Sequence, residues 1–268
     1  MDFLSEFTNL QKLLEEDSPE LESESFLELV PDLLDVLGHP DGKIRDDLGW
    51  TTLSRYFSSD SIHPGNRIPL IELLITDEFL FYKINEGVTD DSPRRSFSAL
   101  SIADLIWGDA DHGPAMDRQF ISKIMGKVRM LLVKDKDHRG FVEGGLGWVH
   151  TSSHIGDCLN ALVAHRNADS DEILTCVTTI LEYVEGRGND VFKWDEHQRL
   201  SRPVTQAIAC LSSQDNLLEV FSRYTPEFMS TAPSRHNLAN MIRRTQSALK
   251  EAGYKNDALE SIFNDITK

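Results

Sequence analysis

Segments with a helical spacing of apolar residues follow one another in pairs along most of the chain. This recurrence restricts the fold more than any other feature. Within residues 26–37, for example, apolar side chains recur every three or four positions and form one stripe, as in an amphipathic helix. No segment shows convincing strand alternation, and no hairpin turn is flanked by alternating apolar residues. The sequence therefore predicts an all-α protein.

The segment 28–57 illustrates how one helix pair is built. Its first helix is predicted to end near Gly38, and a short turn follows at 39–42. A second helix then begins around Arg45 and Asp46. A helix, a tight turn with an aspartate and a helix with an arginine in its first turn are the layout of HEAT-type repeats, which are about 40 residues long.

Similar helix–loop–helix segments recur along the chain, beginning near Ile68, Phe120, Asp171 and Asn216. A single helix pair cannot bury its apolar face alone, so stacking of the pairs into a curved solenoid is the natural solution. We therefore expect a HEAT-like α-α superhelix of about five helix pairs. The predicted organisation is a single domain over 1–268, with an N-terminal capping helix and acidic linker in 1–24, repeats in 25–250 and a C-terminal capping helix in 251–268.

The second helices of the pairs can be aligned on their first turns. One aligned position holds Arg45, Arg95, His150 and Arg199. The position four residues later holds Gly49, Ala99, His154 and Pro203. The third pair thus departs from the rest of the chain by two histidines, which makes its second helix the first place to look for function.

Three stretches of sequence resemble the DUF2785 family, a group of uncharacterised bacterial helical proteins. They read "IRDDLGWTTLSRY", "RRSFSALSIADLI" and "DHRGFVEGGLGWVHTSSHIGDCLNAL". The resemblance extends over roughly residues 25–215, and the last stretch is its most specific part. It implies a single helical-repeat domain and carries no implied activity.

His150, His154 and Asp157 form the first candidate site. On one helix their side chains would share a face, and two histidines four residues apart are a chelating pair in metalloprotease helices. Thr151 stands where such an enzyme has its glutamate base, so that class is excluded. Asp157 lies seven residues from His150, roughly 10 Å along the axis. One ion cannot easily bind all three, and Asp157 is better suited to orient His154.

Two interpretations of the histidines remain open. In the structural one, His150 donates a hydrogen bond to the neighbouring turn, as the aligned arginines would, and His154 is buried near Trp148. In the functional one, they line a pocket or bind a divalent metal, with a further ligand from Asp137, His138, Glu143 or Asp46. We therefore predict no cofactor, and His150 and His154 are the residues that a metal would use.

The glycine-rich loop before this helix reads "DHRGFVEGGLGW". It lacks the Gly-Lys-Ser/Thr of a phosphate-binding Walker A loop, and no strand is predicted before it. It is either a long turn between helices or the wall of a pocket, because loops of this length are often functional. In the second case Arg139, Glu143 and Trp148 belong to the candidate pocket.

Arg45, Asp46 and Arg95 complete the candidate pocket. Neighbouring carboxylates such as Asp46 and Asp47 invite an acid–base role. At a helix start, however, the helix dipole favours aspartate, and an arginine commonly pairs with the next repeat. The structural interpretation is therefore the simpler one for this group.

Charge and hydropathy restrict the partners and the compartment. The net charge of −17 argues against binding to nucleic acid. No apolar run is long enough to cross a membrane, and no signal peptide is evident, so a cytoplasmic protein is expected. The three cysteines are far apart and each lies in an apolar helical pattern, which predicts small buried side chains.

These features lead to two hypotheses about function. The first is a non-enzymatic α-solenoid that binds a protein or peptide on its concave face. The alternative is a metal- or histidine-dependent enzyme, such as a hydrolase, with its site around His150, His154 and Asp157.

Overall fold

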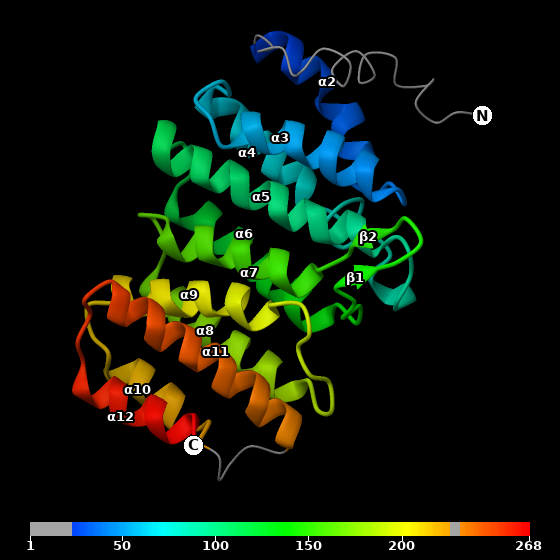
Figure 1. Ribbon diagram of the computed structural model, residues 1–268. Helices are drawn as coiled ribbons and strands as arrows, with labels where there is room; N and C mark the ends of the chain where they lie inside the picture. The colour runs from blue at the N-terminus through cyan, green and yellow to red at the C-terminus, as the bar shows by residue number, and fades with distance from the viewer. Residues whose placement is uncertain (1–22, 226–230) are drawn as a thin grey trace. The chain divides into compact units, whose positions relative to one another are not determined.

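The computed structural model describes residues 23–225 and 231–268, and helices make up most of them (Figure 1). The all-α class predicted from the sequence is confirmed for this part of the chain. The predicted N-terminal helix and nearly all of the acidic linker fall in residues 1–22, outside the described residues.

Contacts within the chain divide it into two compact units. The first ends at Ala115 and also includes Lys136–Thr151. The second consists of Met116–Asp135 and Ser152–Lys268. The single domain expected over the whole chain stays a prediction, and each unit is described by itself.

The first unit is built from a run of helices and one small hairpin. Its elements are α2 (Ser23–Val36), the π-helix η2 (Lys43–Trp50), α3 (Thr51–Phe57), α4 (Pro64–Leu74), the 3-10 helix η3 (Ile84–Glu86), α5 (Ser92–His112), β1 (Phe141–Val142) and β2 (Gly147–Trp148). Helix α2 packs on η2 and α3, while α5 packs on α3 and α4.

The first helix pair has the predicted layout, but its second helix begins as a π-helix. The turn before it is closed by side chains: His39 Nδ1 accepts from the Asp41 amide, and Asp41 Oδ1 accepts from the Lys43 amide. Gly49 lies where η2 crosses α2, and a Cβ atom there would come within 2.6 Å of Val36 Cγ2. The glycine therefore permits the close approach of the two helices.

Helix α5 packs against both α3 and α4 of the first unit. Pro93 lies in its first turn, where a missing amide proton costs nothing. Near its other end, a Cβ atom on Gly108 would lie 2.2 Å from the Phe57 carbonyl oxygen. The contact between α5 and α3 thus depends on a residue without a side chain.

The prediction that the chain has no hairpin is wrong. Strands β1 and β2 pair antiparallel, with Phe141 opposite Trp148 and Val142 opposite Gly147. Each strand has two residues, which is too short for an alternating apolar pattern to appear in the sequence. The glycine-rich loop between α6 and α7 is therefore an ordered hairpin rather than an open turn.

The second unit contains the remaining helices. They are α6 (Arg118–Lys134), α7 (Thr151–Ala164), α8 (Ser170–Gly186), α9 (Glu196–Cys210), α10 (Asp215–Ser222), α11 (Ala232–Glu251) and α12 (Asp257–Ile266). Helix α8 packs on α6, α9 and α11, and α12 packs on α10 and α11 (Figure 1). The predicted closing helix is α12, whose Leu259, Phe263 and Ile266 are buried.

Two further expectations concern the surface. Among the residues that the structure describes, no helix is long and apolar enough to cross a membrane. Cys158 and Cys176 are buried as expected, but Cys210 is exposed. The prediction for Cys210 is wrong because this last residue of α9 lies outside the buried stripe, which ends with Ala207 and Ile208.

Candidate functional site

The hairpin of the first unit is the best-defined candidate site. Residues 143–146 connect β1 to β2, and Gly144, Gly145 and Gly147 have φ angles of 89°, 108° and 70°. Such positive φ values strongly favour glycine, which explains the composition of the loop. The Gly42 amide donates to the Gly145 carbonyl at 2.9 Å, so the tip is tied to the turn before η2.

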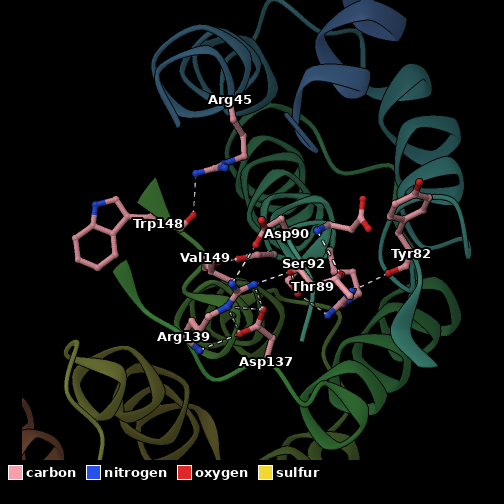
Figure 2. A network of polar contacts seen from close by, with 12 residues as sticks. Arg45, Tyr82, Thr89, Asp90, Ser92, Asp137, Arg139, Trp148 and Val149 are labelled. Atoms are coloured by element: carbon pink, nitrogen blue, oxygen red, sulfur yellow. Dashed lines mark hydrogen bonds and ion pairs between the residues drawn. The ribbon is translucent and has the colours of Figure 1, made fainter. Parts of the chain in front are cut away.

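Arg45 holds this hairpin from inside the first unit (Figure 2). Its side chain is completely buried and donates to the carbonyl oxygens of His39 at 3.0 Å, Leu146 at 2.7 Å and Trp148 at 2.9 Å. Its Nε donates to Asp46 Oδ1 at 2.7 Å. The predicted first-turn arginine is thus a clamp on two loops.

The electrostatics of the Arg45–Asp46 pair support the same role. Burial lowers the pKa of Arg45, and it raises the pKa of Asp46, although each group favours the charged form of the other. The cost of removing both charges from water therefore exceeds their mutual attraction. The guanidinium also lies 4.8 Å from the centre of the Phe97 ring. Its contribution to the fold must come mainly from the carbonyl groups that it satisfies.

Two neighbouring side chains of α5 hold other backbone segments. Arg95 is buried and donates to the Tyr82 carbonyl at 2.8 Å and to Ser92 Oγ at 3.1 Å. Ser96 is also buried and donates to the carbonyl of Val149, which directly follows β2. The start of α5 therefore fixes both the loop before it and the exit from the hairpin.

Arg139 fixes the entrance to the hairpin (Figure 2). It pairs with Asp137 at 2.7 Å and Asp90 at 3.1 Å, and it donates to the Thr89 carbonyl at 2.6 Å. Burial disfavours the charged form of Asp137, but hydrogen bonds from Arg139 and Ser92 and the Arg139 charge outweigh it, and the pKa of Asp137 is lowered. Asp137 is therefore an anchoring carboxylate in this structure.

The outer surface of the hairpin carries exposed aromatic rings. The Phe141 and Trp148 rings lie 5.2 Å apart at an interplanar angle of 73°, and they are 44% and 39% exposed. The imidazole of His150 stacks on the indole at 4.8 Å and 26°. In Figure 2 the indole points away from the guanidinium network that holds its backbone. A fixed backbone therefore presents a row of three rings.

The three residues of the first candidate site do not share a helix face as predicted. His150 has a φ angle of 49° and precedes α7, because the chain must turn sharply between β2 and the helix. His150 belongs to the first unit, whereas His154 and Asp157 belong to the second. The imidazole that is observed to stack on Trp148 is that of His150.

Asp157 has arginine partners in the second unit. Its carboxylate accepts from Arg199 and Arg202, the latter at 2.8 Å. Helices α7 and α9 approach closely here, since a Cβ atom on Gly156 would lie 2.9 Å from the Arg199 carbonyl. Burial raises the pKa of Asp157 while both guanidinium groups act in the opposite direction. This carboxylate thus links α7 to α9.

Glu143 and His154 are the remaining candidate residues. Glu143 is exposed in the hairpin turn, and His154 is buried in α7. Within residues 23–225 and 231–268, no group of three or more His, Cys, Asp and Glu residues is arranged to hold a metal ion.

Comparison with known proteins adds one assignment. Residues 80–250, more than half of the chain, match the family model described as "Protein of unknown function (DUF2785)". The chain belongs to this family. No curated protein and no solved structure matches it. The DUF2785 match includes α5 and the whole hairpin, but it assigns no activity to them.

Sequence reasoning missed part of the site of this DUF2785 protein. Phe141 and Ser96 were not recognised, and neither were the carbonyl groups that receive the arginines. A backbone acceptor leaves no mark in a sequence, because every residue has one. Phe141 had a usable signal, since an aromatic residue next to a glycine-rich loop is well placed to be exposed.

Proposed function

We propose that this DUF2785 chain is a binding module that takes up a segment of a partner protein. Its helix pairs would stack as one HEAT-like α-solenoid domain of about five pairs. The recurrent helix–turn–helix layout supports the solenoid, and the hairpin of the first unit supports the binding role. Within the solenoid, the proposed contact surface is centred on Trp148.

One observation carries the binding role: Phe141 and Trp148 remain exposed although buried side chains fix their backbone. Large aromatic side chains are enriched at protein interfaces and dominate their energetics. A rigid backbone lowers the entropy lost when a partner binds, and this raises affinity. The exposed part of these rings adds no hydrophobic stabilisation to the fold, whereas a partner that covered it would gain that stabilisation on binding.

The polar residues near the hairpin support binding over catalysis. Arg45 and Arg139 are engaged with carbonyl groups and carboxylates of the first unit. Asp137 carries a lowered pKa, which is the opposite of what a carboxyl group needs to act as a general acid near neutral pH. These groups have the arrangement of structural supports beneath a surface.

Selection from a library of displayed random peptides of about 15 residues tests the proposal. The purified full chain is immobilised, and enriched peptides are measured against the wild type, Trp148→Ala and Trp194→Ala. Trp194 is the matched control because it is 40% exposed and lies in the second unit. We expect peptides that lose at least about tenfold in affinity with Trp148→Ala and keep it with Trp194→Ala.

Two results would contradict the proposal. In the first, no peptide is enriched above an unrelated acidic protein. In the second, peptides bind equally well to the wild type and to Trp148→Ala. Circular dichroism melting of each variant shows whether a loss of binding comes from loss of the fold.

A further inference from the structure

We infer that the second unit binds a free amino acid with an apolar side chain in a pocket between α11 and α12. The pocket has a volume of about 250 Å³, and none of its lining residues belongs to the hairpin of the first unit. The inference therefore goes beyond the proposed binding function and does not depend on it. Its basis is an apolar floor flanked by one ammonium group and one carboxylate.

A short turn connects α11 to α12, which pack on each other, and it fixes one end of the pocket (Figure 1). Gly253 has a φ angle of 72°, and its amide donates to the Lys250 carbonyl at 3.0 Å. The Tyr254 amide donates to the Leu249 carbonyl at 2.9 Å, which completes a Schellman motif at the end of α11. Asn256 then caps α12, because its Oδ1 accepts from two first-turn amides at 3.1 Å each. The turn is thus preformed, which lowers the entropy lost when a ligand binds.

The polar lining residues come from facing sides of the two helices. Gln246 and Lys250 lie about one turn apart on α11. Glu260 and Asn264 have the same spacing on α12. Gln246 Nε2 donates to Asn264 Oδ1 at 3.3 Å, so this pair joins the two helices. Because the chain reverses between the helices, one helical turn from this bond toward the connecting turn places Lys250 and Glu260 on opposite walls.

These two walls carry opposite charges. Among the described residues that line the pocket, Lys250 is the only cation and Glu260 the only anion, while the exposed Glu251, Lys255 and Asp257 do not line it. Neither charged group of the pocket makes an ion pair or a hydrogen bond within residues 23–225 and 231–268. An amino acid carries one charge of each sign at neutral pH. Its carboxylate can therefore pair with the ammonium group and its own ammonium with the carboxylate, which leaves no charge unpaired.

The floor of the pocket is apolar. It consists of Leu249, Leu259 and Phe263, all of them buried. The Phe263 ring is held by an edge-to-face contact with Phe221, with ring centres 5.0 Å apart. A cavity of about 150 Å³ in another protein holds a benzene molecule. The present pocket is larger and has room for the side chain of leucine or phenylalanine together with the charged groups of the amino acid.

Ligands with a different charge fit this pocket less well. A fatty acid or a simple amine would pair with only one of the two charged walls, and an uncharged side chain of a partner protein with neither. An amino acid such as aspartate would bring its additional charge against the apolar floor, where no opposite charge is available. An amino acid with an apolar side chain is the ligand class that matches all three parts of the lining.

Saturation-transfer NMR titrations of the full chain test the inference. The probes are L-phenylalanine, L-leucine and L-aspartate, together with N-acetyl-phenylalanine, which lacks the ammonium group, and phenylalanine amide, which lacks the carboxylate. The pocket variants are Lys250→Met and Glu260→Gln. Lys255→Met and Asp257→Asn are the matched controls, because both residues are exposed and lie outside the lining.

We expect L-phenylalanine and L-leucine to bind and L-aspartate to bind far more weakly. Each singly charged derivative should bind the wild type about fivefold more weakly than L-phenylalanine, and so should L-phenylalanine with each pocket variant, as for ion pairs that solvent partly screens. Glu260→Gln should not weaken N-acetyl-phenylalanine further, whereas Lys250→Met should, because only the carboxylate of this derivative remains to be bound. The two control variants should bind L-phenylalanine as the wild type does.

The other outcomes overturn the inference in distinguishable ways. No saturation transfer to any amino acid would reject the site. Equal binding of L-phenylalanine and both derivatives would mean that the pocket recognises an apolar group alone, such as a side chain of a partner protein. Unchanged binding in both pocket variants would place the amino acid elsewhere on the chain. Circular dichroism melting separates a loss of binding from a loss of the fold, and none of these results bears on the peptide selection that tests the hairpin.

Discussion

Replacement of Arg45 by methionine is the sharpest perturbation of the site. Methionine has a similar length and can still pack against Phe97, but it donates no hydrogen bond. The change leaves the carbonyl groups of His39, Leu146 and Trp148 without their buried donor. It also leaves the partly buried Asp46 without its cation.

The magnitude follows from these contacts. A hydrogen bond to a charged group contributes about 1.5–3 kcal/mol, and such terms are not additive within one network. Removing one partner of a buried ion pair costs about 3–5 kcal/mol. Methionine avoids the free-energy cost of burying a charged guanidinium group, and this offsets part of the loss. We therefore expect Arg45→Met to lower the free energy of unfolding by about 3–5 kcal/mol.

Equilibrium urea unfolding followed by circular dichroism measures the effect. Arg45→Lys keeps the charge, but an ammonium cannot reproduce the planar fork that reaches three carbonyl groups, so it should recover only part of the loss. Arg223→Met is the control, because Arg223 and its partner Glu219 are 61% and 67% exposed. Its cost should stay below about 1 kcal/mol. A loss below about 1 kcal/mol for Arg45→Met would refute the clamp.

Three further predictions concern other parts of the structure. Gly108→Ala should lower the free energy of unfolding in urea by about 1–3 kcal/mol, because its Cβ would overlap the Phe57 carbonyl. Asp137→Asn should cost about 1.5–3 kcal/mol at neutral pH. Because the pKa of Asp137 is lowered in the folded chain, its carboxylate stabilises the fold at pH values above its unfolded pKa near 3.8, and this stabilisation is lost as the pH falls through the folded pKa. The difference in free energy of unfolding between Asp137→Asn and the wild type should therefore narrow below about pH 4. Of the three cysteines, Cys210 alone should react rapidly with a thiol reagent at pH 8, since the other two are buried.

Each of these predictions has its own control. Gly126→Ala should be neutral or stabilising, because nothing lies within 4 Å of a Cβ atom there. An Asp137→Asn difference that does not change between pH 6 and pH 3 would contradict the pKa argument. In 6 M urea all three thiols should react, and in the folded chain burial raises the pKa of Cys176 to about 12. Fast labelling of Cys176 without urea would contradict the packing of α8.

The sequence predicted the helices well because each helix buries a stripe at the helical period. The turn at 39–42, the start of α5 at Pro93 and the closing helix α12 were all identified from caps, prolines and apolar spacing. These signals are local, so they can be read without knowing the neighbouring elements. The stacking of the pairs depends on contacts between distant segments and stays a proposal.

The candidate site was only partly predictable. The aligned arginines pointed to Arg45 and Arg95, and the structural interpretation of both agrees with their hydrogen bonds. The helix-face argument for His150 failed because it assumed that the helix had already begun, whereas the chain takes a left-handed turn at that residue. The hairpin was missed because its two-residue strands are shorter than any pattern that the sequence can display.

Hydrogen–deuterium exchange of the hairpin most directly tests whether it is a preformed platform for a partner. The Val149 amide donates to the Gly140 carbonyl at 2.8 Å, and the hairpin tip is tied to Gly42 at 2.9 Å. We expect residues 141–149 of the wild type to exchange at least about 100-fold more slowly than an unstructured peptide. In Arg45→Met this protection should be lost while that of α11 is kept. Exchange of 141–149 at the unprotected rate in the wild type would contradict a preformed platform.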